Sequence, residues 1–126
     1  MDSITLSMHY LGSFSDDEFY KFCLDNPDLK FERTAQGQII IMPNTGGKTG
    51  KLYAKLTYFL TAWNLKYGLG ENFDSSTAFQ LPSLAVRSPD AAWVSKSRWE
   101  ALTEEQQIKF PPICPDFVIE LRSESD

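Results

Sequence analysis

The sequence predicts an α/β or α+β domain in which helices flank a sheet. Three observations predict this class. Segments with helical spacing of apolar residues alternate with short apolar runs of the kind that form strands. Capping boxes mark where helices begin, and glycine and proline mark where they end. At 126 residues, 42% of them hydrophobic, the chain is long enough for one domain, covering 1–126, with its own core.

The N-terminal part of the chain predicts a helix followed by a hairpin. No clear pattern precedes the capping box at residues 15–18, which opens the helix. Asn26-Pro27 ends it. Residues 31–33 and 38–42 then predict two strands joined by a turn at Gly37.

The middle of the chain predicts the longest helix. A glycine-rich loop covers 43–49, a helix covers 50–67, and Gly68 ends it. Apolar residues at spacings of three and four predict one apolar face. Its members are Leu52, Leu56, Phe59, Leu60 and Trp63.

The C-terminal half predicts short strands and short helices. Residues 71–81 predict one or two strands, and residues 88–94 predict another. Short helices follow, one from Ser95 and one from a second capping box at 103–106. The last strand covers 115–122.

An acidic residue accompanies each of the two most apolar strands. The run from Pro115 to Arg122 predicts a central, buried strand that places Glu120 where water is scarce. A buried carboxylate needs a proton, a cationic neighbour or a metal ion. Asp90 precedes an apolar run of the same kind, and two such strands side by side would direct both acids at one point. An acid at a strand end is also commonly just a cap or a surface residue.

Two carboxylates at one sheet edge suit Mg²⁺ (or Mn²⁺), because hard cations prefer oxygen ligands. The bound metal can activate a water and stabilise charge on a phosphate. Asp116 shares strand parity with Glu120 and is either a strand-start cap or a further ligand. His9 is the only histidine, so neither a catalytic triad nor a structural zinc site is predicted.

The glycine-rich loop resembles a nucleotide-binding motif only in part. Gly47-Lys48-Thr49 mimics the end of a P-loop, but Met42 stands where that motif needs a glycine. No nucleotide cofactor is therefore predicted. Lys48, Lys51 and Lys55 fall near one helical face at a helix N-terminus, which suits a phosphate backbone. A solvated lysine face is the plain alternative.

Composition restricts the partners and the compartment. The net charge of −5 argues against broad attraction to nucleic acid, although a local basic patch is compatible with DNA binding. No apolar run approaches the length of a membrane span and the polar N-terminus is no signal peptide, so no membrane partner is expected. Cys23 and Cys114 lie far apart in different settings and predict free thiols in a cytoplasmic protein.

Several motifs together resemble a known family from Ser15 onward. They are Glu32-Arg33 with Gly37, Phe73-Asp74-Ser75-Ser76, Gln80-Leu81-Pro82, Arg87-Ser88-Pro89-Asp90-Ala91-Ala92-Trp93-Val94, Arg98-Trp99-Glu100-Ala101-Leu102-Thr103 and Cys114-Pro115-Asp116-Phe117-Val118-Ile119-Glu120-Leu121-Arg122-Ser123. They resemble the restriction-endonuclease-like family called domain of unknown function 820, in the PD-(D/E)xK nuclease superfamily. The resemblance implies a restriction-endonuclease-like mixed sheet flanked by helices and metal-dependent hydrolysis of DNA phosphodiester bonds.

The resemblance also implies roles for individual residues. By position, Asp90 is the metal-binding aspartate and Glu120 is the second acid. Glu32 is a candidate third carboxylate, with an ordinary salt bridge in the hairpin as the alternative. The superfamily places a lysine two positions after the second acid, and here that residue is Arg122. Arginine can face a phosphate, but it stays protonated and cannot accept a proton.

Family members usually continue beyond this strand into a helix that carries a lysine and a last pair of strands. We therefore expect a domain truncated on its C-terminal side, a weak or inactive nuclease, and a homodimer formed at the uncovered edge. The first alternative function is an inactive remnant that binds nucleic acid or protein. The second gives the two acids a purely structural role, with Asp90 and Glu120 in salt bridges to Arg87 and Arg122.

Overall fold

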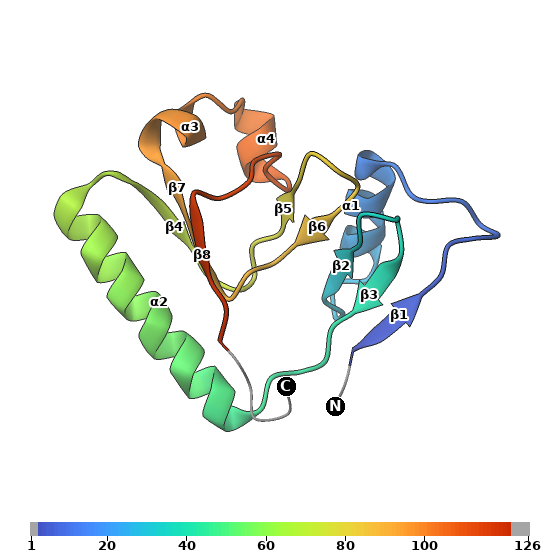
Figure 1. The fold of residues 1–126 in the computed structure, drawn as a ribbon, viewed down its shortest axis with the longest axis horizontal. Coiled ribbons are helices and arrows are strands. Elements are labelled where there is room, and N and C mark those ends of the chain that lie inside the picture. Colours follow the sequence, from blue (N-terminus) through green and yellow to red (C-terminus); the bar gives the residue numbers. More distant parts are fainter. Residues whose placement is uncertain (1–2, 122–126) are drawn as a thin grey trace.

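Two antiparallel sheets organise the chain in the computed structural model, which describes residues 3–121 (Figure 1). The first sheet has the strand order β1-β3-β2-β6-β5, and the second has the order β4-β7-β8. In chain order the elements are β1 (Ile4–Leu6), α1 (Asp16–Asp25), β2 (Phe31–Arg33), β3 (Ile39–Ile41), α2 (Gly47–Tyr67), β4 (Gly70–Phe73), β5 (Phe79–Gln80), β6 (Val86–Arg87), β7 (Ala91–Ser95), α3 (Lys96–Glu100), α4 (Glu104–Ile108) and β8 (Phe117–Ile119).

The five-stranded sheet forms around the predicted hairpin. β2 and β3 pair with Phe31 opposite Ile41, and Gly37 takes a φ of 84° in the turn between them. This conformation favours glycine, because a side chain there is strained. β1, which no sequence pattern predicted, pairs with the other edge of β3. α1 packs against this sheet through Phe19, which is fully buried in one cluster with Phe31.

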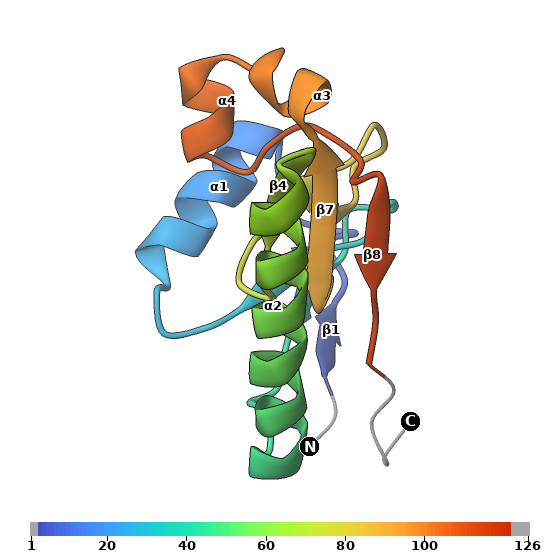
Figure 2. The same ribbon diagram turned by 90° about the vertical axis from the view of Figure 1, so that its left-hand side faces the viewer.

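α2 packs along the three-stranded sheet (Figures 1 and 2). Polar contacts join the two: Nε1 of Trp93 donates to Oδ1 of Asn64 at 2.9 Å, and Nδ2 of Asn72 donates to Oγ1 of Thr61 at 2.7 Å. α3 and α4 lie at the end of the molecule opposite the N-terminal turns of α2 (Figure 2). The second core cluster is built from the buried residues Phe79, Ala92, Val94 and Ile113.

Residues 88–90 connect the two sheets. β6 ends at Arg87 in the first sheet, and β7 begins at Ala91 in the second. Ser88 is buried, and its N–H donates to Oε2 of Glu32 at 2.9 Å. Nη1 of Arg87 lies 3.2 Å from Oε1 of the same carboxylate. The Glu32 carboxylate therefore fixes how one sheet continues into the other.

The predicted class, an α/β domain with helices flanking a sheet, is confirmed. The strand pairs of the described residues are antiparallel. Both capping boxes form, at Ser15 and at Thr103, each with its two reciprocal hydrogen bonds. The strand after Asp90 is also present as β7.

The start of α2 was predicted too late in the sequence. The helix begins at Gly47 rather than at Gly50, because the N–H of Gly50 already donates to the carbonyl of Gly46 at 2.9 Å. The turn that was predicted as part of a loop therefore belongs to the helix.

The predicted apolar face of α2 is only partly the face that the helix buries. The buried residues of the helix are Leu60 and Asn64, whereas Phe59 of the predicted face is 67% exposed. The hydrogen bond between Asn64 and Trp93 sets which side of the helix meets the sheet. The spacing of apolar residues carries no information about this polar contact. It therefore pointed to a side of α2 that includes exposed aromatic residues, rather than to the side that meets the sheet.

The prediction of a central, buried last strand is wrong. β8 stands at the edge of its sheet and pairs with β7, and its Phe117 and Val118 are 39% and 47% exposed. Glu120, which follows β8, is exposed as well. An apolar run does not by itself separate a buried strand from an edge strand. Here the Phe117 ring stacks on Trp93, with ring centres 5.7 Å apart, so an aromatic residue is retained on an exposed strand.

A fully buried arginine holds α1 against the first sheet. Arg33, on β2, is 0% exposed. Its Nη1 donates to the carbonyls of Phe14 and Ser15 at 3.1 and 3.2 Å. Its Nε donates to the carbonyl of Leu84, and its Nη2 pairs with Asp16. A buried charge is tolerated because its donors find acceptors and its charge is paired.

We expect Arg33→Lys to lower the free energy of unfolding by about 3–5 kcal/mol. An ammonium group cannot reproduce the planar fork that serves four acceptors here. Urea denaturation followed by circular dichroism measures the change. Arg98→Lys is the matched control, because Arg98 contacts Asp116 and the Cys114 carbonyl at the surface, where a loss of about 0–1 kcal/mol is expected. Equal losses in the two variants would contradict the role assigned to the buried arginine.

Candidate functional site

Asp90 and Glu120 meet at the end of the three-stranded sheet. β7 and β8 pair with Ala91 opposite Ile119, and the next step of this antiparallel register places Asp90 opposite Glu120. The two segments stay in contact beyond the paired residues of β7 and β8, because the N–H of Leu121 donates to Oδ2 of Asp90 at 2.5 Å. The expectation that the two acids lie on neighbouring strands agrees with this register. That they share one ion stays a prediction.

Two neighbouring carboxylates act on the carboxyl of Glu120. Partial burial of this carboxyl raises the pKa of Glu120, and the negative charges of Asp90 and Glu32 raise it further, with a contribution from a side-chain hydrogen bond to Asp90. The positive charge of Lys30 opposes these effects. Sites that hold cations or move protons often contain an acid whose ionisation is opposed by nearby like charges.

Glu32 joins the acid pair from the other sheet. Its side chain is only 13% exposed. Both of its oxygens are engaged, Oε1 by Nη1 of Arg87 and Oε2 by the N–H of Ser88. The salt bridge expected as the alternative role of Glu32 therefore exists, but its partner lies on β6 rather than in the hairpin. Arg87 accordingly pairs with Glu32 and not with Asp90, contrary to the purely structural alternative.

The acid pair offers two carboxylates to a cation rather than three. Among residues 3–121, no group of three or more His, Cys, Asp or Glu side chains is arranged to hold a metal ion. A carboxylate has about four acceptor sites, so the bond from Leu121 leaves Asp90 with capacity for a ligand. Mg²⁺ is commonly held by one or two carboxylates, with waters and substrate phosphates completing its octahedron. The donor set of Asp90 and Glu120 fits Mg²⁺ or Mn²⁺ in this way.

The three predicted DNA-contacting lysines stand near this end of the molecule. Lys48, Lys51 and Lys55 are exposed in the N-terminal half of α2. In both ribbon views the N-terminal turns of α2 extend beyond the three-stranded sheet, at the end where β8 finishes (Figures 1 and 2). Arg122, predicted to face the phosphate, lies outside the described residues.

Residues 16–126 match the family Uma2, described as "Putative restriction endonuclease". The chain is a member of the Uma2 family. Membership confirms the family resemblance seen in the motifs, agrees with a restriction-endonuclease-like fold, and points to nuclease function. No curated protein matches the chain. Within residues 3–121, no helix combines the length and the apolar character that a membrane span requires.

Lys30 is a residue beside the candidate site that sequence reasoning missed. It directly precedes β2 and lies two positions before Glu32, and residues two apart in a strand lie on the same face. Its Nζ donates to the carbonyl of Ser75 at 2.8 Å, and its charge favours the ionised form of Glu120. The parity of β2 was the signal that could have identified it.

Asp116, considered as a further metal ligand, has a structural role at the other end of β8. Its Oδ2 accepts the N–H of Ser95 at 2.7 Å, and its Oδ1 lies 2.9 Å from Nη1 of Arg98. The backbone hydrogen bond, followed by the arginine, holds the pKa of Asp116 below its ordinary value. Asp116 is thus the strand-start cap that the sequence offered as one of two roles.

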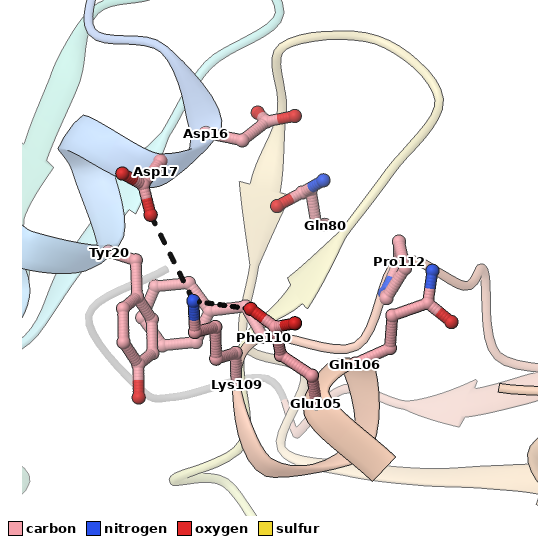
Figure 3. Close-up of a pocket in the computed structure, with 9 residues that line it drawn as sticks. All are labelled: Asp16, Asp17, Tyr20, Gln80, Glu105, Gln106, Lys109, Phe110 and Pro112. Atoms are coloured by element: carbon pink, nitrogen blue, oxygen red, sulfur yellow. Dashed lines mark hydrogen bonds and ion pairs between the residues drawn. The ribbon is translucent and has the colours of Figure 1, made fainter. Parts of the chain in front are cut away.

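A pocket of about 270 Å³ lies between α1 and α4, and neither Asp90 nor Glu120 lines it (Figure 3). The one lysine among its lining residues pairs with two of the acids that line it. Nζ of Lys109 lies 2.9 Å from Oε1 of Glu105 and 4.0 Å from Oδ1 of Asp17. Because its lining includes neither acid, the pocket is separate from the acid pair of this Uma2 protein.

We expect Glu120→Gln to raise the melting temperature at about pH 8 in EDTA. The pKa of Glu120 is raised in the fold, so its ionisation removes folding stability as the pH rises through that folded value. Below the ordinary value of 4.5 the variant and the parent should converge. Thermal unfolding across this pH range measures the difference.

Asp116→Asn is the matched control at the other end of β8, and its expected effect has the opposite sign. The pKa of Asp116 is lowered, so its ionised form adds stability above the ordinary value of 3.8, and that stability is lost as the pH falls through the folded value. This variant should therefore melt lower than the parent at about pH 8. A Glu120→Gln variant that also melts lower there would contradict the repulsion assigned to the acid pair.

Proposed function

We propose that this Uma2 protein is a metal-dependent endonuclease that hydrolyses DNA phosphodiester bonds at Asp90 and Glu120. The observation that carries the proposal is the register of β7 and β8, which brings the two acids opposite each other where the sheet ends. The raised pKa of Glu120 supports it, because like charges gathered at one point are stabilised by a cation.

Asp90 and Glu120 would hold Mg²⁺ or Mn²⁺, which when bound supplies an activated water and neutralises charge on the phosphate. Asp90 is oriented for this by the N–H of Leu121. Glu32 acts as a positioning residue rather than a ligand, because both its oxygens already hold the connection between the sheets. It keeps the segment that carries Asp90 in place.

Cations around the acid pair would contact the DNA backbone. We assign this role to Lys48, Lys51 and Lys55 on α2, which are exposed at the same end of the molecule as the finish of β8. Lys30 adds a positive charge beside Glu120. Arg122 would face the phosphate as a fixed charge, since a guanidinium does not give up its proton.

Asp90→Asn and Glu120→Gln should each lower Mg²⁺-dependent DNA cleavage by roughly 10²–10⁴-fold, because each removes a charged ligand of the metal. Nicking of a supercoiled plasmid, with Mg²⁺ and with EDTA, measures the rate. Asp116→Asn is the control: it changes a carboxylate at the other end of β8 that is bound to Ser95 and Arg98, so cleavage per folded molecule should be retained. Cleavage that continues in EDTA, or in both acid-pair variants, would overturn the proposal.

The alternative function is a catalytically inactive member of the family that binds nucleic acid or protein. It is favoured by the absence, within residues 3–121, of a metal-holding group of three acidic, histidine or cysteine side chains. Isothermal titration with Mn²⁺ at about pH 8 and about pH 5 separates the two functions. The nuclease proposal expects binding that weakens toward the lower pH, because protonation of Glu120 competes with the metal. No binding to the parent at either pH would favour the inactive form.

We also propose a homodimer formed at the open edge of β8. Within the described residues β8 pairs with β7 alone, and Phe117 and Val118 are partly exposed there. An exposed apolar edge strand recruits a partner strand. Val118→Lys should shift the chain from dimer to monomer in sedimentation velocity, whereas the control Tyr10→Lys, at a residue that is 94% exposed away from β8, should not.

A further inference from the structure

One side of α2 carries lysines and an aromatic ring along nearly the whole helix. Its residues are Lys48, Lys51, Lys55, Phe59 and Lys66, which we call the α2 stripe. Their spacing places them on one side, turned away from Leu60 and Asn64, the buried residues of the helix. At about 1.5 Å per residue the α2 stripe is roughly 27 Å long.

The lysines of the α2 stripe form a concentration of positive charge on an acidic protein. α2 contains no aspartate or glutamate, although the whole chain has a net charge of −5. Among the ion pairs of the described residues, none includes Lys51, Lys55 or Lys66. Lys66 instead lies over the ring of Tyr67, with Nζ 5.4 Å from the ring centre. A concentration of positive charge on an acidic protein indicates a surface for a polyanion.

Aromatic rings on and beside the α2 stripe reach solvent. Tyr58, Phe59 and Tyr67 are 66%, 67% and 54% exposed. Tyr58 and Phe59 meet edge to face, with centres 5.3 Å apart, which leaves ring surface exposed. The bases of a duplex are already stacked on one another, whereas an unpaired base can stack on a protein ring. Cations that follow a backbone, interleaved with rings that accept bases, are the recurring features of single-strand binding surfaces.

A second copy of the chain is a poorer occupant of this surface. Two copies meeting through the α2 stripe would bring four lysines toward the same four lysines. Such a contact between like charges is disfavoured. The apolar edge of β8 offers a separate place for self-association.

We propose that the α2 stripe binds single-stranded DNA, with the lysines on phosphates and Phe59 stacked on a base. The choice of DNA rests on the proposed function, and the binding itself does not require the metal. The N-terminal turns of α2 extend toward the end of the molecule where β8 finishes, so a bound strand would be led toward the acid pair (Figures 1 and 2).

Fluorescence anisotropy with a labelled thymidine oligonucleotide of about 20 nucleotides tests the proposal, in EDTA to prevent cleavage. We expect binding at least about tenfold tighter than to a duplex of equal length. Lys51→Gln and Lys55→Gln should each reduce the salt slope of the association constant by about 0.7, the value for one phosphate contact on a single strand. Lys96→Gln, on α3, removes the same charge elsewhere and should leave the slope unchanged.

Phe59→Ala should weaken binding by about 5- to 150-fold, the range expected for the loss of one stacked base. Because Phe59 is 67% exposed, its removal leaves the core intact. Tyr10→Ala, at a residue that is 94% exposed in the N-terminal segment, is the aromatic control and should bind like the parent.

Equal or tighter binding to the duplex, or variants on α2 that bind like their controls, would overturn the inference. A dimer that Phe59→Ala converts to monomer without weakening DNA binding would do so as well, since the stripe would then be a self-association surface. If these results occur while Mg²⁺-dependent cleavage persists, the proposed nuclease function survives. Single-strand binding that remains in a chain unable to bind Mn²⁺ or cleave supports the inference and removes the nuclease function.

Discussion

The buried guanidinium of Arg33 is the constraint on which the arrangement of the first sheet depends. A charge with no exposure to water is stable only where every donor finds an acceptor. Here the acceptors come from the segment that opens α1 and from the turn before β6, so these segments must converge on β2. The ring of Phe19 lies 5.1 Å from the guanidinium and closes the site from the side of α1.

Glu32, the residue before Arg33, lies on the opposite face of β2. Successive side chains of a strand alternate between faces, so a position that buries Arg33 toward α1 directs Glu32 the other way. Glu32 binds Arg87 and the N–H of Ser88, and thereby fixes the three-residue connection that ends in Asp90. The position of the candidate catalytic acid is thus a consequence of the alternation in β2. A site that is positioned by a strand in this way is held more precisely than a site that is positioned by a loop.

Much of this arrangement could be predicted from the sequence, because local signals determine it. The capping boxes, the turn at Gly37 and the strand after Asp90 depend on neighbours in the chain. The exposure of β8 and the rotation of α2 could not be predicted in this way. They depend on contacts between elements that are distant in the sequence, such as the hydrogen bond between Asn64 and Trp93. The acid pair was predictable as two strands with matching patterns. The contacts of Glu32 with β6 were not, because residues distant in sequence make them.

The opposite charges at this end of the molecule imply a link between metal binding and DNA binding under the proposed function. Asp90 and Glu120 would repel a phosphate backbone until a metal ion neutralises them, whereas the lysines of the α2 stripe would attract it at any metal concentration. Beyond a Debye length of about 8 Å at physiological salt the two effects are largely independent. Close to the acids they are coupled, and the coupling is reciprocal: a bound metal favours the phosphate, and the phosphate favours the metal by the same factor. Under the two proposals, the α2 stripe would therefore hold DNA without cleaving it, and the acid pair would engage the backbone only once the metal is bound.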